Sequence, residues 1–195
     1  FKEDLKGLLA YSTISHLGLI VCLLGLGSPL AIAAAIFHII NHATFKAALF
    51  MIAGIIDHES GTRDLRKLSG LWQLLPYTAT LTMVTAASMA GVPLTNGFLS
   101  KEMFFTELLS NLSGPVLICS AIVATLAGIF AVAYSVRLVH GVFFDGPLGK
   151  QVPNKDAHEP PFGMRAPATL LAILCILVGL FPALLVENIV NSTAR

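Results

Sequence analysis

The chain has 195 residues, of which 55% are hydrophobic and 12% are charged, and its net charge is +1. A soluble domain usually carries about 25% charged residues, so this composition, with a mean hydropathy of +0.80, indicates lipid as the main solvent. The near-neutral charge offers no basic field and argues against a nucleic-acid partner. The three cysteines lie in apolar runs at spacings that fit no metal or redox motif, so we expect no metal and no cofactor.

The chain begins at Phe1 and opens on the charged run Lys2-Glu3-Asp4. A secretory signal needs a basic segment followed by a cleavable apolar stretch, and this opening has neither. We therefore expect no signal peptide, and we expect the chain to be an internal piece of a longer protein.

Five membrane crossings are predicted, because about 20 residues with little or no charge can cross a hydrocarbon core of about 30 Å. No segment of any length alternates as a strand would. The predicted fold class is therefore all-α, one polytopic transmembrane helix bundle. In chain order the crossings are 7–27, 29–56, 72–110 with a break at 91–97, 114–144 and 164–188.

The third crossing is predicted to be a discontinuous helix. Pro93 removes a backbone donor, and Gly91 and Gly97 loosen the chain on either side, so the helix should break there. Residues 98–110 should form a short half-helix beyond the break. A broken helix is tolerated in a membrane only where its free backbone groups face protein or a polar cavity. The break therefore indicates an ion or substrate site.

Basic residues gather on one side of this topology. The excess of Lys and Arg belongs in the cytoplasm. We therefore predict a multi-pass protein of a prokaryotic plasma membrane, with loops 57–70 and 145–164 cytoplasmic. The second loop is rich in Pro, Gly and charge, and we expect it to be a solvated connector. One side receives Lys2, Lys6, Arg63, Arg66, Lys67, Arg137, Lys150, Lys155 and Arg165, and the other receives Arg195.

The strongest chemical signal is a ladder of titratable residues in the second crossing. His38, His42 and Lys46 are four residues apart, so they share one helix face and extend over about 12 Å. A charged lysine at mid-membrane costs about 2.5 to 3.5 kcal/mol unless it meets water or a partner. Histidine titrates near neutral pH, and a lysine held away from water can do so too. We interpret the ladder as part of a proton relay.

Two other interpretations of the ladder stay open. Lys46 could snorkel to the interface, although it lies about ten residues, or about 15 Å, from the predicted cytoplasmic end of its crossing. His38 and His42 could instead share a metal or a haem, although no second histidine pair lies at matching depth.

Lys101, one turn past the break with Glu102 beside it, is the second signal. If the break opens a wet cavity, Lys101 is a titratable site within it. If the half-helix ends near an interface, Lys101 is simply solvated. Lys6, taken alone, is interpreted as an interface anchor, and His16 as a satisfied polar residue at a helix contact.

Three ordered motifs, residues 4–18, 37–50 and 91–102, resemble the antiporter-like membrane subunits. That family includes proton-pumping subunits of respiratory complex I and subunits of multisubunit Mrp-type sodium/proton antiporters. Within it, residues 57–68 and 164–165 are most similar to the large A subunit of Mrp antiporters. The resemblance covers almost the whole chain.

The resemblance implies that the matched lysines and histidines line a hydrated path across the middle of the membrane. The resemblance changes the interpretation of Lys6 from an interface anchor to a relay member. It also supports the same relay role for His38, His42, Lys46 and Lys101. It also implies a complete module of two inverted repeats, of which this chain covers only the later part, roughly one half-channel. By itself the chain should not transport anything.

The predicted function is part of a monovalent cation/proton antiporter subunit, without catalytic residues, that supplies a proton half-channel. Expected partners are protons, Na⁺ or another monovalent cation, the lipid bilayer, and other membrane subunits of a hetero-oligomeric complex. The alternative is a membrane subunit of a redox-driven proton pump, which would use the same relay, so the relay cannot discriminate. A purely structural anchor is a third interpretation, but it would gain nothing from buried titratable groups.

Overall fold

The computed structural model describes residues 2–145 and 156–182, and within them it contains helices and no strand. The predicted all-α class is confirmed. The α-helices are α1 (Leu5–Leu26), α2 (Pro29–Ser60), α3 (Pro76–Ala90), α4 (Asn96–Asn111), α5 (Gly114–Val139) and α6 (Phe162–Leu180). A 3₁₀ turn, η1 (Leu71–Gln73), precedes α3, and a π-helical turn, η2 (His140–Phe144), extends α5.

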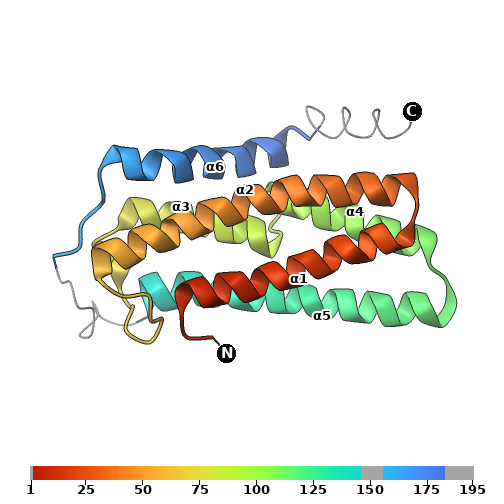
Figure 1. Cartoon of the computed structure of the whole chain (residues 1–195), viewed down its shortest axis with the longest axis horizontal. Coiled ribbons are helices and arrows are strands. Elements are labelled where there is room, and N and C mark those ends of the chain that lie inside the picture. The colour runs from red at the N-terminus through yellow and green to blue at the C-terminus, as the bar shows by residue number, and fades with distance from the viewer. Residues whose placement is uncertain (1, 146–155, 183–195) are drawn as a thin grey trace.

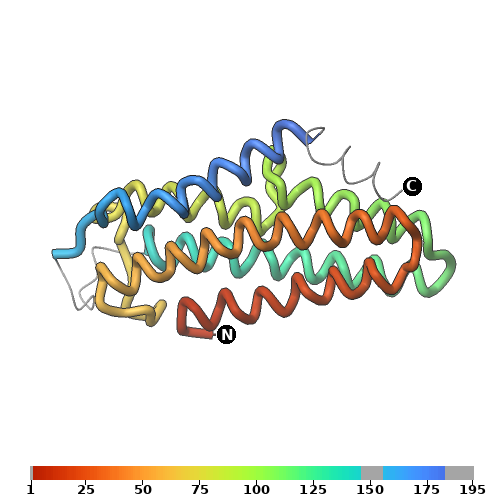
Figure 2. Tube along the Cα trace, turned by 45° about the horizontal axis from the view of Figure 1, so that its top comes forward, coloured from red at the N-terminus to blue at the C-terminus, as the bar shows by residue number. Residues whose placement is uncertain are grey.

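The helices lie roughly parallel in one elongated bundle, with α3 and α4 end to end beside α2 (Figure 1, Figure 2). Within the described residues, four helical segments are long and apolar enough to cross a membrane: α1, α2, α5 joined to η2, and α6. Helices α3 and α4 have 15 and 16 residues, so only together do they match the length of a crossing. The last predicted crossing extends to 188, and its part beyond Phe181 and Pro182 lies outside the described residues.

The two ends of the bundle differ in charge. One end carries the segment 61–75 and the start of α6, and we call it the basic end. Here Arg63 pairs with Asp4 at 2.7 Å, and Arg66 pairs with Glu3 at 2.8 Å. The opposite end carries the turns 27–28 and 112–113, which contain no Lys or Arg.

Local sequence explains where α1 and α2 meet. Gly27 ends α1 in the left-handed region, with φ 72°, and Ser28 then accepts a hydrogen bond from the Ala31 N–H at 3.0 Å. Pro29 follows at the first helical position, where its missing N–H is not needed. Helix α2 then runs to Ser60, four residues past the predicted end of the second crossing, because Gly61 supplies the left-handed stop there.

The third crossing is interrupted at the position that the sequence indicates. Helix α3 ends at Ala90, and Gly91 caps it with φ 84°. Pro93 lies in the connection, and α4 begins at Asn96. Gly97 is needed for close packing, because a Cβ there would lie 1.8 Å from the Ser88 carbonyl oxygen. The two half-helices therefore meet in direct backbone contact.

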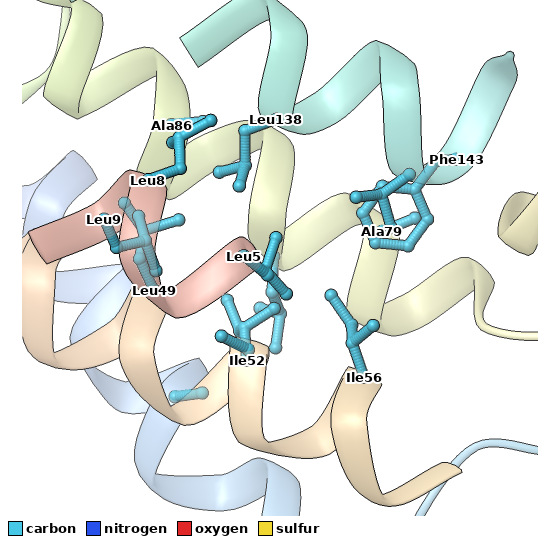
Figure 3. Close-up of a cluster of buried hydrophobic side chains, with 14 of the residues drawn as sticks. Leu5, Leu8, Leu9, Leu49, Ile52, Ile56, Ala79, Ala86, Leu138 and Phe143 are labelled. Carbon is cyan, nitrogen blue, oxygen red and sulfur yellow. The ribbon is translucent and has the colours of Figure 1, made fainter. Parts of the chain in front are cut away.

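The largest apolar core fills the basic end of the bundle. Its side chains come from α1, α2, α3, α5 and α6, and Figure 3 shows Leu5, Leu9, Ile52 and Leu138 among them. By contrast, α5 exposes large apolar side chains such as Phe130, which is 65% exposed. Soluble proteins rarely expose contiguous apolar surfaces of this kind, whereas lipid or further membrane helices would cover them.

The end of the second predicted cytoplasmic loop is partly packed against the bundle, although Asp156, His158 and Pro161 are exposed, as expected of a solvated connector. Ala157 and Pro160 are buried. Glu159 accepts hydrogen bonds from the backbone N–H and the hydroxyl of Thr78, both at 2.9 Å. Thr78 lies in the first turn of α3, where backbone N–H groups lack helical partners, so a carboxylate is favoured there. Residues 146–155 lie outside the described residues.

We predict that Gly97→Ala destabilises the parent protein. A Cβ at this position overlaps the Ser88 carbonyl and must push α3 and α4 apart, and overpacking costs about 1 to 3 kcal/mol or more. The thermal unfolding midpoint of the purified parent complex should fall. Gly54→Ala is the control, because nothing lies within 4 Å of a Cβ there. Equal midpoints for the two variants would contradict the close contact.

Candidate functional site

Lys46 lies near the middle of the 32-residue helix α2 and is only 4% exposed. Its ammonium donates to the Leu9 carbonyl at 3.1 Å and to the Ser12 hydroxyl, and it contacts the Met89 sulfur at 3.4 Å. All three partners are neutral. The lysine is thus enclosed between α1 and α3, and the snorkelling interpretation is wrong.

Three histidines form a cluster beside Lys46. His16 Nδ1 and His38 Nε2 lie 3.2 Å apart, so one imidazole donates and the other accepts, depending on the tautomers. The ring centroid of His42 is 5.2 Å from that of His16 and 6.3 Å from that of His38. The Nε2 atom of His42 is buried and has no hydrogen-bond partner among the residues described. The two histidines of the ladder therefore meet a third from α1.

Tyr134 of α5 completes this cluster. Its hydroxyl lies 3.2 Å from His16 Nε2, so both nitrogens of His16 have partners. The prediction that His16 is a satisfied polar residue at a helix contact is confirmed by these two hydrogen bonds, but sequence reasoning did not identify its partners and did not consider Tyr134. One signal was available, because Ser12 and His16 are four residues apart and share a face of α1 with Leu9. Tyr134 also lies inside an apolar helix and not at its end, where interfacial tyrosines are found.

Lys101 satisfies the broken end of α3. It is half-buried, and its ammonium donates to the carbonyls of Met89 at 3.2 Å and Ala90 at 2.6 Å. These are carbonyls that the helix leaves free when it stops, and a cation at a helix C-terminus also complements the helix dipole. Lys101 is therefore held in the break and not simply solvated. Met89 contacts both lysines, with its sulfur toward Lys46 and its carbonyl toward Lys101.

A small cavity connects Lys101 with the histidine cluster. It has a volume of about 20 Å³, and Ser15, His16, Lys101 and Tyr134 supply its polar lining. One water molecule needs about 10 to 15 Å³ and two to four polar partners, so the cavity is large enough for one. The cavity is therefore bordered by both a histidine and a lysine side chain.

Lys6 stands apart from this cluster. It pairs with Asp57 at 3.2 Å near the basic end, and both side chains are more than a third exposed. Among the residues that the structure describes, it contacts neither a histidine of the cluster nor another lysine. The apolar core of Figure 3, with Leu5 and Ile52, occupies the same end of the bundle. The structure thus brings together four of the five predicted relay residues, His38, His42, Lys46 and Lys101.

The part of the chain that the structure describes contains no group of three or more His, Cys, Asp or Glu side chains that could hold a metal ion. The geometry instead gives a membrane bundle with a helix broken at mid-depth, a lysine in the break, and buried titratable side chains beside it. Intramembrane ionisable groups next to a discontinuous helix characterise membrane proteins that move ions.

The comparisons with known proteins identify the family. The family model described as "NADH:quinone oxidoreductase/Mrp antiporter, TM" matches residues 1–134. The chain belongs to this family. That description names both respiratory enzymes and antiporters, so membership alone does not separate the two.

The relatives include antiporter subunits. The A/B subunit of a probable K⁺/H⁺ antiporter of Rhizobium meliloti (strain 1021) is 64% identical over 94% of this chain and 18% of its own length. The A subunit of a Na⁺/H⁺ antiporter of Alkalihalophilus pseudofirmus is 47% identical over 97% of this chain and 26% of its own. A chain in the structure of the Mrp complex from Dietzia sp. DQ12-45-1b is 40% identical, with a TM-score of 0.83 over 100% of this chain and 20% of that one. The chain thus spans about a fifth to a quarter of the length of these relatives.

We predict that Lys46→Met stabilises the parent protein. The substitution removes a buried cation with neutral partners, and Ser12 keeps its own hydrogen bond to the Leu9 carbonyl at 2.8 Å. The gain should reach about 2.5 to 3.5 kcal/mol, the insertion cost of a mid-membrane charge. The thermal unfolding midpoint of the purified complex measures it.

Lys6→Met is the matched control for this prediction. Its partly exposed ion pair with Asp57 should contribute about 1 kcal/mol or less, so this variant should be neutral or slightly destabilised. A fall in the midpoint for Lys46→Met, larger than for Lys6→Met, would contradict our account of Lys46.

Proposed function

We propose that this chain supplies a proton half-path in an Mrp-type cation/proton antiporter. The observation that carries the proposal is the cluster in which Lys46, Lys101 and three histidines meet around Met89 and Tyr134. Holding several ionisable groups away from water is costly, and such groups in membrane proteins generally mark ion pathways. The resemblance to antiporter A subunits over most of the chain supports the choice of reaction.

Protons would pass between imidazoles and lysines, directly or through water. The His16–His38 contact is already a hydrogen bond, and a proton that arrives on one ring can leave from the other. The cavity beside Lys101 has room for the water that would connect this pair to the break. Lys46 and Lys101 share Met89, so a charge on one ammonium disfavours a charge on the other, which couples their protonation.

Lys6 remains part of the proposal as the relay member nearest the basic end. Its partial exposure would let it exchange protons with water there, and Asp57 would be its ion-pair partner. The link from Lys6 to Lys46 would follow α1, because the Leu9 carbonyl that binds Lys46 lies one turn further along that helix.

We place the protein in a prokaryotic plasma membrane, with residues 57–70 and 145–164 on the cytoplasmic side. The ion-paired arginines at the basic end support this orientation under the positive-inside rule. Other membrane subunits would cover the exposed apolar faces of α1 and α5. The chain spans only a fraction of its relatives' length, which is consistent with a larger assembly around it.

The exchanged ion is proposed to be a monovalent cation. One relative is named for K⁺ and another for Na⁺, so both cations belong in the test. The family also includes subunits of NADH:quinone oxidoreductases, so a redox-driven pump is the second candidate. Such a pump would move protons only while an electron donor is oxidised.

We predict that Lys46→Ala abolishes cation-driven proton exchange. Inverted vesicles that contain the complete parent complex are given a pH gradient, and Na⁺ or K⁺ is added without any electron donor. A fluorescent probe follows the gradient. The wild type should dissipate the gradient, and the variant should not, because the relay loses its central group.

Lys67→Ala, in an exposed position of the 61–75 segment, is the control and should behave as wild type. Normal exchange by Lys46→Ala would contradict the relay. Proton movement that starts only when an electron donor such as NADH is supplied would assign the chain to a redox pump.

We also predict that Tyr134→Phe slows exchange without abolishing it. The ring and its packing remain, and only the hydrogen bond to His16 is lost. A neutral hydrogen bond contributes about 0.5 to 1.5 kcal/mol, which corresponds to a roughly two- to tenfold lower rate. The same vesicle assay measures the rate. An unchanged rate would remove Tyr134 from the path.

A further inference from the structure

A second buried ionisable group lies at the opposite end of the bundle, away from the histidine cluster. Glu107, near the end of α4, is only 8% exposed. Its Oε2 atom accepts a hydrogen bond from the Ser28 hydroxyl at 2.9 Å and another from the Asn111 amide at 3.1 Å. The carboxyl group is thus held between α4 and the start of α2.

Glu107 has no cationic partner among the described residues. The helices that pack against α4 place their charged side chains and histidines elsewhere, while Cys22 and Cys119 share a cavity with Leu108 on this side of the bundle. The nearest charged residues on α4 itself are Lys101, which is bound in the break, and Glu102, which is exposed. The remaining charged residues and histidines of these helices lie in the relay cluster or toward the basic end, and they are Lys6, His16, His38, His42, Lys46, Asp57, His58, Glu59, Arg137, His140 and Arg165.

The hydrogen bonds suit either protonation state of this carboxyl group. Both donors bind Oε2, and no donor within the described ranges reaches Oε1. A proton on Oε1 would leave both hydrogen bonds in place, because Oε2 then accepts them as a carbonyl oxygen. Glu107 can therefore gain or lose a proton without any rearrangement of Ser28 or Asn111.

An apolar layer separates Glu107 from the relay. Ser28, Ala31, Ala35 and His38 share one face of α2, so the face that contacts Glu107 leads to the histidine cluster over about 15 Å. The side chains in this layer are apolar and buried, and they come from α1, α2, α4 and α5. They are Ile20, Leu23, Ala31, Ala34, Ala35, Phe104, Leu108 and Ala124.

We propose that Glu107 is the proton-exchange group at the opposite end of this half-path. It would pass protons between the solution on that side and the relay at His38 and Lys101, when water transiently enters the apolar layer. A purely structural role does not explain the residue, since a glutamine could accept the same two hydrogen bonds without the cost of a buried charge. The inference rests on the proposed function and extends the path to the side facing away from the basic loops.

The test compares Glu107→Gln with Glu107→Asp in vesicles of the complete parent complex. Glutamine keeps the shape and the two hydrogen bonds but cannot carry a proton, so the maximal exchange rate should fall by about tenfold or more. Aspartate should restore a measurable part of that rate. The cation concentration for half-maximal exchange should not change, because the group handles protons.

Glu102→Gln is the matched control, since Glu102 is exposed on the same helix and should tolerate neutralisation. The amount of assembled complex is measured for every variant, and rates are expressed per assembled complex. If assembly fails for Glu107→Gln, Asn111→Ala, which removes one donor to the carboxyl, should still lower the maximal rate relative to Glu102→Gln.

Two results would overturn the inference. A wild-type exchange rate in Glu107→Gln would overturn the role of Glu107. If Lys46→Ala is inactive in the same assay, the proposed function still stands. A raised half-maximal cation concentration with an unchanged maximal rate would instead make Glu107 a cation ligand. If Lys46→Ala is also fully active, the proposed function itself is at fault.

Discussion

The structure depends on one constraint: inside a membrane, every backbone polar group needs a partner within the protein. A helix that stops at mid-depth violates this constraint unless something else satisfies its last carbonyls. Here Gly91 turns the chain so that its own N–H donates to the Ala87 and Ser88 carbonyls. The Lys101 ammonium donates to the next two carbonyls, those of Met89 and Ala90. The break and the lysine are therefore a single structural unit, and the close contact at Gly97 fixes their geometry.

The same unit determines where the buried charges lie. Met89 and Ala90 hold Lys101 at the level of Lys46, because the Met89 sulfur contacts the second lysine. Around them the protein supplies hydroxyls, carbonyls and imidazoles, and no carboxylate among the described contacts. Burying these lysines without a carboxylate partner lowers the stability of the protein at this site, as is usual for functional sites. The apolar core at the basic end supplies compensating packing.

Much of this arrangement could be predicted from sequence. The four-residue spacing of His38, His42 and Lys46 fixes their common face, and Pro93 with its flanking glycines locates the break. These are properties of one helix or one turn. The role of His16 could not be derived in this way, because it depends on how α1 is rotated against α2 and α5. Lys6 shows the same limit: its position along α1 was clear, but its pairing with Asp57 joins residues 51 positions apart.

The hydrogen bonds of Lys101 bear on the proton transfer that we propose for this site. The side chain serves two carbonyl oxygens, and a lysine that has lost its proton still has two N–H donors. The end of α3 can thus stay fully hydrogen-bonded in both states, and the backbone need not move when the proton leaves. Arginine could occupy the same place, but it never gives up its proton under such conditions. In this position lysine serves as a helix cap, and in the proposed path the same side chain would also gain and lose a proton.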